Sequence, residues 1–213
     1  TGDYPGPGSR TDNRNLIAEA EDAGYSYVST AAELANLDCA AAGKVLGLFG
    51  DGDLFPDLYL ADDPAAQAPS LEAMTACAIA ALSTDPQGFF LVVEEEGIDE
   101  LAHDNLAAPT LDAVLGFDAA VAAGLGFARP RNDSLVIVTG DHETGGLSVM
   151  SPEPGGCPPP GQGPFTTPDG GAFCVAFLTR SHTGEQIHVA AEGPYQARVE
   201  GGIDNTDLFA IMR

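Results

Sequence analysis

Near the middle of the chain lies a continuous apolar run, Gly88-Phe89-Phe90-Leu91-Val92-Val93. A hydrophobic stretch of this length predicts a strand that is buried on both faces, which is typical of a parallel sheet covered by helices. Similar runs occur before and after it, at residues 45–49, 134–139 and 174–179. We therefore expect these four segments to be neighbouring strands of one mainly parallel sheet.

Helices with capping residues at their starts are expected between and around these strands. They cover residues 12–23, 71–82, 110–125 and 205–213. Strands that alternate with helices predict an α/β fold, here a three-layer α/β/α sandwich with a mainly parallel central sheet. Because 213 residues fit one domain or a large part of one, we expect residues 1–213 to be a portion of a single domain.

The chain is strongly acidic, with 8 Lys+Arg against 32 Asp+Glu and a net charge of −24. Such a surface repels nucleic acid and anionic membranes, so neither is expected as a partner. The sequence contains no run of about 18 apolar residues, so no transmembrane helix is expected. The acidity fits a very soluble secreted protein, and it equally fits adaptation to high salt, where screening relieves the self-repulsion.

The four cysteines are Cys39, Cys77, Cys157 and Cys174. None of them forms a CxxC pair, which argues against a thiolate zinc site. Cys157 and Cys174 flank a Gly/Pro-rich loop at 151–171 that a disulfide could pin. Cys39 and Cys77 are either a second bridge or two buried thiols, and the sequence leaves both open because bridging depends on distances.

Three of the four histidines follow a predicted strand along the chain. They are His103, His142 and His182. In open α/β sheets, ligands bind at the carboxyl ends of the strands, so three such positions in one sheet would bring these side chains together. His188 has no carboxylate nearby in the sequence, and we expect it to be structural.

Carboxylates accompany two of these histidines. Asp99 and His103 are spaced i,i+4, so one helical turn presents both on the same side. Asp141 and His142 are adjacent, and on a strand they would point to opposite faces. They can converge only where the backbone turns irregular, which nearby glycines permit, among them Gly140.

Histidine with carboxylate is a ligand set for zinc, and a catalytic zinc keeps three protein ligands and one open position. Asp99, His103 and His182 would make such a set. Glu94 adds a hard oxygen ligand that suits magnesium. The neighbouring acidic residues Glu95, Glu96 and Glu100 are expected to be solvated charges.

At these residues the chain resembles the alkaline phosphatase family. Val93-Glu94-x-x-x-Ile98-Asp99-x-x-x-His103 is similar to the family's V-E-x-x-x-I-D-x-x-x-H segment, and residues 136–146 are similar to its V-T-A-D-H-E-T-G-G segment, with Gly140 in place of the usual Ala. The resemblance runs in order over essentially the whole chain. The further matches are Gly47-Leu48-Phe49, Pro69-Ser70-Leu71-x-x-Met74-Thr75, His182-Thr183-Gly184-Glu185, Gly193-Pro194 and Asp204-Asn205-Thr206.

This resemblance implies an alkaline-phosphatase-like fold and the hydrolysis of phosphomonoesters through a phosphoserine intermediate, at a site with two Zn²⁺ and one Mg²⁺. The first zinc, which binds the substrate phosphate and activates the attacking water, would be held by Asp99, His103 and His182. The second, which activates the serine nucleophile, would be held by Asp141 and His142. Magnesium would bind Glu94. The location implied is periplasmic or extracellular.

The chain departs from the family at the nucleophile. The D-S-A segment that carries the serine has no counterpart, and the only Asp-Ser pair, Asp133-Ser134, opens a predicted strand. The family's other metal-binding aspartate, its magnesium threonine and its phosphate-binding arginine are also missing. A site short of ligands at two of three metals predicts that the N-terminal part of the protein is absent from this sequence, so no catalytic residue is assigned.

The partners expected are therefore a phosphomonoester substrate and the missing N-terminal half of the same protein, with a homodimer as an option. Two alternatives stay open. One is a zinc-binding module without chemistry, and the other is a phosphodiesterase of the same superfamily.

Overall fold

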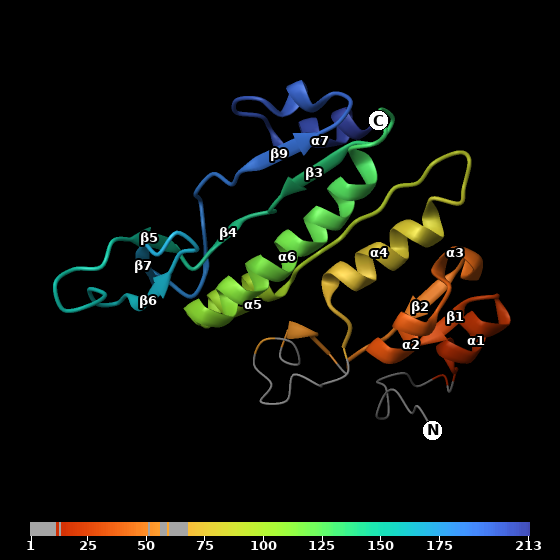
Figure 1. Ribbon diagram of the computed structural model, residues 1–213, viewed down its shortest axis with the longest axis horizontal. Helices are drawn as coiled ribbons and strands as arrows, with labels where there is room; N and C mark the ends of the chain where they lie inside the picture. The colour runs from red at the N-terminus through yellow and green to blue at the C-terminus, as the bar shows by residue number, and fades with distance from the viewer. Residues whose placement is uncertain (1–11, 13, 51, 56–58, 60–67) are drawn as a thin grey trace. The chain divides into compact units, whose positions relative to one another are not determined.

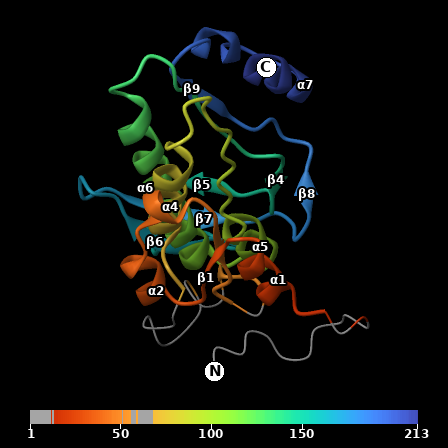
Figure 2. The ribbon, with the colours of Figure 1, turned by 90° about the vertical axis from the view of Figure 1, so that its right-hand side faces the viewer.

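The computed structural model describes residues 12, 14–50, 52–55, 59 and 68–213. The described chain separates into two compact units (Figures 1 and 2). The first unit contains the residues up to Gly97 together with Ala113–Ala123, and the second contains Ile98–Asp112 together with Gly124–Arg213. The expectation of one domain over residues 1–213 stays a prediction.

Among its described residues, the first unit holds a short parallel strand pair and several helices. Ser26 of the first strand pairs with Val45 of the second. The capping box of α2, in which Thr30 and Glu33 bond each other's backbone, and the Ser70 cap of α4 explain where these helices begin. The elements are α1 (Leu16–Asp22), β1 (Ser26–Val28), α2 (Ala31–Asn36), α3 (Cys39–Ala42), β2 (Val45–Gly47) and α4 (Leu71–Leu82).

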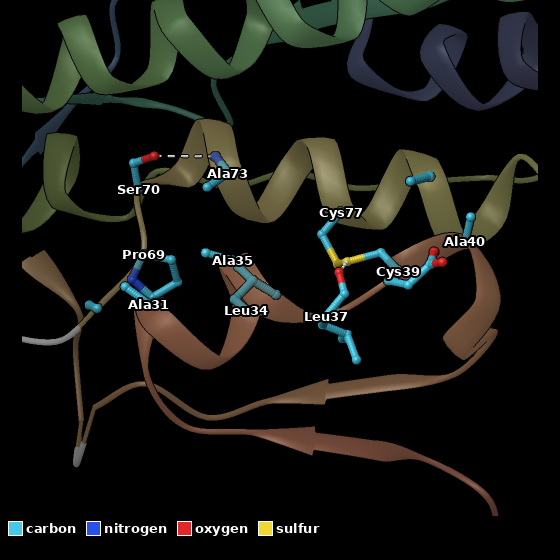
Figure 3. Close-up of a pocket in the computed structure, with 13 residues that line it drawn as sticks. Ala31, Leu34, Ala35, Leu37, Cys39, Ala40, Pro69, Ser70, Ala73 and Cys77 are labelled. Carbon is cyan, nitrogen blue, oxygen red and sulfur yellow. Dashed lines mark hydrogen bonds between the residues drawn. A yellow bond between two sulfur atoms is a disulfide. The ribbon is translucent and has the colours of Figure 1, made fainter.

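A disulfide between Cys39 and Cys77 links α3 to α4 and settles the alternative that the sequence left open. Cys39 is buried with Val28 and Leu34 in a small core under these helices. An apolar pocket of about 550 Å³ lies beside the disulfide, and alanines make up much of its wall (Figure 3). The residues that line this pocket include no cluster of polar side chains of the kind that catalysis requires.

The apolar run at 88–93 forms no strand, so the expectation of a doubly buried strand there was wrong. Residues 88–95 have no regular secondary structure, and the side chains of Phe90 and Val92 are 70% and 71% exposed. Exposure alternates along the segment, with Phe90, Val92 and Glu94 more exposed than Leu91 and Val93. The period of two is that of a strand with one uncovered face.

The second unit consists of antiparallel pairs. β3 pairs with β9, β4 pairs with β8, and β7 lies between β5 and β6. The elements are α5 (Gly97–His103), α6 (Ala107–Ala128, shared with the first unit), β3 (Val136–Thr139), β4 (Glu143–Thr144), β5 (Ser148–Met150), β6 (Gln162–Thr166), β7 (Ala172–Ala176), β8 (His182–Thr183), β9 (Val189–Glu192), the 3₁₀ helix η2 (Gln196–Val199) and α7 (Asn205–Met212).

The mainly parallel sheet and the three-layer sandwich are therefore not found among the described residues, where β1 and β2 form the only parallel pair. The apolar character of residues 174–179 has a different cause from the one expected. β7 is covered on both edges by antiparallel neighbours, and Val175 and Phe177 are buried with Ala102 and Ala107 in the core of the second unit. Residues 174–177 are buried, and burial of a strand does not determine the direction of its neighbours.

The loop at 151–171 is partly regular, because it contains β6. A disulfide joins Cys157 of this loop to Cys174 of β7, as the flanking positions of the two cysteines suggested. Cys174 is fully buried.

Helix α6 is long and apolar enough to cross a membrane by length and composition alone, which the sequence reading did not anticipate. The same features occur in core helices of soluble proteins, so they are weak grounds for a membrane. Ala107, Ala113 and Ala120 of this helix are buried, but only 17% of its apolar stretch is buried, and Val114 and Leu115 are 43% and 66% exposed.

Candidate metal centre

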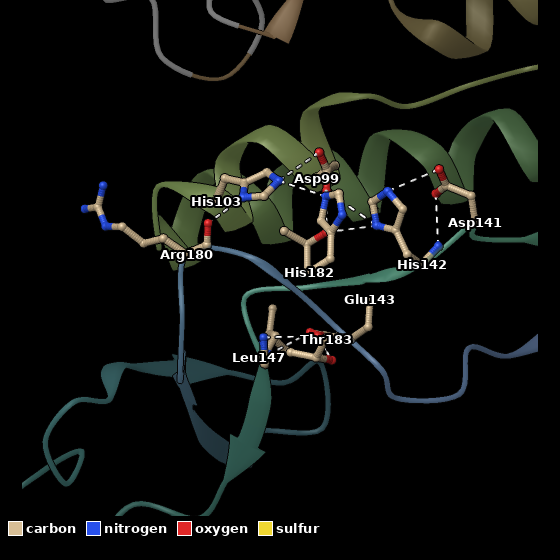
Figure 4. A network of polar contacts seen from close by, with 11 residues as sticks. Asp99, His103, Asp141, His142, Glu143, Leu147, Arg180, His182 and Thr183 are labelled. Carbon is tan, nitrogen blue, oxygen red and sulfur yellow. Dashed lines mark hydrogen bonds and ion pairs between the residues drawn. The ribbon is translucent and has the colours of Figure 1, made fainter.

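Helix α5 presents the first two candidate ligands. Asp99 and His103 lie one turn apart, and Asp99 Oδ2 is 3.5 Å from His103 Nε2 (Figure 4). The i,i+4 spacing is thus realised as one helical turn with both side chains directed to the same side. Both side chains are about one-third exposed, so a small ion can reach them from solvent.

β8 brings His182 to these two residues. His182 Nε2 lies 3.0 Å from His103 Nε2 and 3.6 Å from Asp99 Oδ1. One potential ligand atom from each of the three residues falls within 4.8 Å of the others. The three side chains therefore converge from two segments that are distant in sequence.

The backbone fixes the tautomer of His103. Its Nδ1 lies 2.7 Å from the carbonyl oxygen of Arg180, which can only accept a hydrogen bond, so Nδ1 carries the proton. Nε2 is then left with its lone pair facing Asp99 and His182. A carbonyl behind one ring nitrogen is the usual arrangement by which a protein orients a metal-binding histidine.

His142 joins the same cluster. Its Nδ1 is 3.8 Å from Asp99 Oδ1, and its ring stacks on that of His182 with the ring centroids 3.6 Å apart. Asp141 Oδ2 lies 3.2 Å from His142 Nε2, so the two adjacent side chains do converge. The backbone at 141–142 is a bend, which removes the alternation that a strand would impose. Asp141 itself is 87% exposed.

Two glycines make the tight turn after this bend. Gly145 and Gly146 have φ of 84° and 59°, a region that favours glycine. A Cβ on Gly145 would lie 2.8 Å from the Phe177 ring. The turn lets Glu143 accept hydrogen bonds from the N–H groups of Gly146 and Leu147 and from the Thr183 hydroxyl.

The pKa of Glu143 reflects these contacts. Burial acts to raise it, but the Thr183 hydroxyl and the Leu147 and Gly146 N–H groups outweigh burial, so the pKa is lowered. Glu143 is thus an ionised structural group that ties β4 to β8, and its carboxylate is already occupied by protein donors.

Thr144 is a site residue that the sequence reading missed. Its hydroxyl donates to Asp99 Oδ1 and lies 3.3 Å from His142 Nδ1. The sequence signals were its position two residues after His142 and its place in the segment that resembles the family, because hydroxyl contacts across the fold leave no periodic pattern.

Among the acidic residues at the start of α5 and just before it, not all have the exposure that was expected. Glu96 and Glu100 are exposed as expected. Glu95 is half-buried and accepts hydrogen bonds from the Tyr59 hydroxyl at 3.0 Å and from the Gly97 N–H at 3.1 Å, so its expected role as a solvated charge was wrong. Burial raises its pKa, against the effect of these two hydrogen bonds. Glu94 belongs to the first unit, and its assignment to magnesium stays a prediction.

The donor set of the cluster fits zinc. Two imidazole nitrogens and a carboxylate oxygen from Asp99, His103 and His182 are the ligand types and the number found at open zinc sites. A cation at the centre would also satisfy the two Nε2 atoms that face each other at 3.0 Å.

Comparison with known proteins shows the family to which the chain belongs. The alkaline phosphatase family model matches residues 1–176. The chain belongs to the alkaline phosphatase family. Alkaline phosphatase of Escherichia coli is 33% identical over 94% of this chain and 47% of its own length, and alkaline phosphatase 4 of Bacillus subtilis is 33% identical over 94% and 54%. Streptomycin-6-phosphate phosphatase of Streptomyces griseus is 33% identical over 93% of this chain and 50% of its own length.

Solved alkaline phosphatases share the fold. A mutant of the TAB5 alkaline phosphatase, with Mg bound in its M3 site, has a TM-score of 0.70 and 25% identity over 95% of this chain and 55% of its own. A cold-active alkaline phosphatase from Shewanella has a TM-score of 0.73, with 92% of this chain and 61% of its own chain covered. The chain spans about half the length of the curated relatives that it matches.

Proposed function

We propose that this chain provides the metal-binding half of an alkaline phosphatase that hydrolyses phosphomonoesters. The observation that carries the proposal is the convergence of Asp99, His103 and His182, from α5 and β8, on one point. A cluster made by chance in an acidic chain would not also have the Nδ1 of one histidine bonded to a backbone carbonyl behind the site.

The residue roles follow the two parts of the cluster. Asp99, His103 and His182 hold the first Zn²⁺. Asp141 and His142 hold the second, supported by the 3.2 Å approach between their side chains. Glu94 binds Mg²⁺.

When bound, the metals supply charge that stabilises the attacking and leaving oxygens of the phosphoryl group. The chain's own residues prepare that arrangement. The carbonyl of Arg180 holds the His103 lone pair toward the site, and the Thr144 hydroxyl orients Asp99 against His142. The turn at Gly145 and Gly146 brings the His142 and His182 segments together.

The serine nucleophile and the remaining ligands come from further polypeptide, the missing N-terminal half. Two observations support this. The curated relatives are about twice as long as this chain. The extended segment that ends at Glu94 leaves Phe90 and Val92 uncovered on one face, and a strand with an apolar face is stable when another strand or helix covers it.

The protein works in an oxidising compartment, periplasmic or extracellular. Two disulfides, Cys39–Cys77 and Cys157–Cys174, account for all four cysteines. Structural disulfides form and persist in such compartments and are rare in the cytosol.

The test compares the 213-residue chain with a protein extended by the coding sequence upstream of Thr1. The chain alone is expected to hydrolyse p-nitrophenyl phosphate at background. The extended protein is expected to be active, to lose activity with a chelator or with His182→Ala, and to keep it with His188→Ala. Sedimentation of the same sample reports whether it is a homodimer.

Three results would overturn parts of the proposal. Turnover by the 213-residue chain alone would show that it carries a nucleophile. Faster hydrolysis of bis-p-nitrophenyl phosphate than of the monoester would identify a phosphodiesterase. Zinc binding with no activity in the extended protein would leave a binding module.

A further inference from the structure

Asp99 and His103 reach the metal cluster from α5, whereas His182 reaches it from a segment that begins 79 positions after His103. Several contacts place residues 179–182. Thr179 and Ser181 bond the backbone of Gly145, and the Arg180 side chain lies 3.4 Å from Asp104 at the end of α5. We infer that Asn105, held in place by Gln162, is a further positioning residue, which sets the distance between His103 and His182. The inference rests on the proposed zinc site.

The Asn105 side chain spans the two segments. Two carbonyl oxygens face the Asn105 amide, which can bond them only in the orientation that points its nitrogen at them. In that orientation the nitrogen donates to the carbonyl of Thr179 at 2.8 Å and to the carbonyl of Ala102 at 3.0 Å. Ala102 directly precedes the ligand His103, and Thr179 lies three residues before the ligand His182. One amide group thus joins the carbonyl oxygens of both ligand-bearing segments.

Two properties of asparagine suit this position. Its backbone is left-handed, with a φ of 57°, a region that asparagine tolerates better than most residues. Its amide nitrogen has two hydrogens, which match the two carbonyl oxygens. Aspartate would tolerate the backbone but would set a negative charge against both oxygens, and glycine would keep the backbone but lose the bridge.

Gln162 of β6 holds the backbone around Asn105. Its Nε2 donates to the Asn105 carbonyl at 2.5 Å, and its Oε1 accepts from the Ala107 N–H at 3.1 Å. Leu106, the residue before α6, has no side-chain capping bond, so Gln162 supplies a bond to the first turn of that helix. The turn between α5 and α6 is thereby tied to the core sheet β5–β7–β6.

The bridge lies beside the contact that orients His103. Arg180, whose carbonyl accepts from His103 Nδ1, directly follows Thr179. If Thr179 shifts, the acceptor of His103 and the ligand His182 shift with it. The effect expected is therefore on zinc affinity, in the range of about tenfold to a hundredfold that residues behind metal ligands exert.

The experiment measures zinc affinity of the 213-residue chain by competition with a chromophoric chelator, at a temperature well below unfolding. Asn105→Gly and Asn105→Asp are expected to weaken zinc binding at least about tenfold. Gln162→Glu, which keeps the acceptor for Ala107 but loses the donor to Asn105, is expected to weaken it less. Urea unfolding of each variant in chelator separates an effect on folding from an effect on the site.

Matched controls exist elsewhere in the chain. Asn36 donates its amide to the Ala32 carbonyl in α2, and Gln196 accepts from the Gly193 N–H. Asn36→Gly and Gln196→Glu therefore make the same chemical changes away from the cluster, and both should leave zinc affinity unchanged.

The outcomes distinguish this inference from the proposed function. No zinc binding by the unaltered chain would remove the proposed site. Tight binding by the unaltered chain that persists in folded Asn105→Gly and Asn105→Asp would leave the site intact and overturn the positioning role. Equal losses in Asn36→Gly would mean that general destabilisation, and not position, sets the affinity.

Discussion

His103 Nε2 and His182 Nε2 lie 3.0 Å apart, although the two residues are 79 positions apart in the chain and belong to different elements. Asp99 lies within 3.6 Å of both. Three side chains from one helical turn and one strand thus form a centre that neither segment could form alone.

The first prediction removes one member of this centre. His182→Ala should abolish tight zinc binding in calorimetric titration, because two ligands remain where three are needed. His188→Ala is the control, since His188 has no side-chain contact with the cluster in the part of the chain that the structure describes. Equal losses in the two variants would mean that the ligands are misassigned.

Thr144 should matter for the same site through its hydroxyl. Thr144→Val keeps the shape but loses the contacts to Asp99 and His142, so zinc affinity should fall by about tenfold or more. Thr144→Ser should keep most of the affinity. Thr167→Val removes a comparable hydroxyl bond, to Asp169, outside the cluster, and a similar loss in that variant would refute a specific role for Thr144.

The start of α2 should respond to acid. Hydrogen bonds from the Ser29 N–H and hydroxyl, with a further contribution from Thr30, lower the pKa of Glu33 against the effect of burial. A carboxylate whose pKa is lowered on folding stabilises the folded state at any pH above the ordinary glutamate pKa of about 4.3. This contribution disappears as the pH falls through the lower pKa of the folded state.

Glu33→Gln should therefore destabilise the protein more at pH 7 than at pH 3, as measured by urea unfolding across this range. Glu21→Gln, an exposed position on α1, serves as the control. A Glu33→Gln effect of the same size at both pH values would contradict the role assigned to the carboxylate.

Each disulfide should stabilise its own unit. Replacing Cys157 and Cys174 together with alanine should cost about 3 kcal/mol of unfolding free energy from loop closure, because 17 positions separate the two residues. The same change at Cys39 and Cys77, 38 positions apart, should cost about 4 kcal/mol. Urea unfolding of both double variants measures which loses more unfolding free energy. A larger loss in the Cys157/Cys174 variant would show that lost packing around the cysteines outweighs loop closure.

Salt should raise thermal stability if the net charge of −24 reflects a saline habitat. Screening weakens repulsion among the acidic side chains, so the melting temperature should increase from low to molar sodium chloride. Repeating the scan with sucrose separates screening from general exclusion effects. A melting temperature independent of salt would favour the alternative of a merely soluble secreted protein.

Local features of this protein follow from its sequence alone. Ser70 accepts the hydrogen bond from Ala73 that starts α4, and the i,i+4 spacing of Asp99 and His103 places both on one turn of α5. The glycines near Asp141 and His142 also indicated that the backbone there could be irregular, and the structure has a bend at these two residues. These features depend on contacts within a few positions, which the order of residues specifies directly.

The tertiary structure alone decided the rest. The run at 88–93 has the composition of a buried strand, yet a strand forms only where another backbone accepts its hydrogen bonds, and composition does not name that partner. For the same reason, the sequence did not predict the antiparallel neighbours of β7, the contacts of the Thr144 hydroxyl with Asp99 and His142, or the hydrogen bond from Asn105 to Thr179. The contacts from Thr144 to Asp99 and from Asn105 to Thr179 join residues far apart in the chain, so their distances are set by how the whole unit packs.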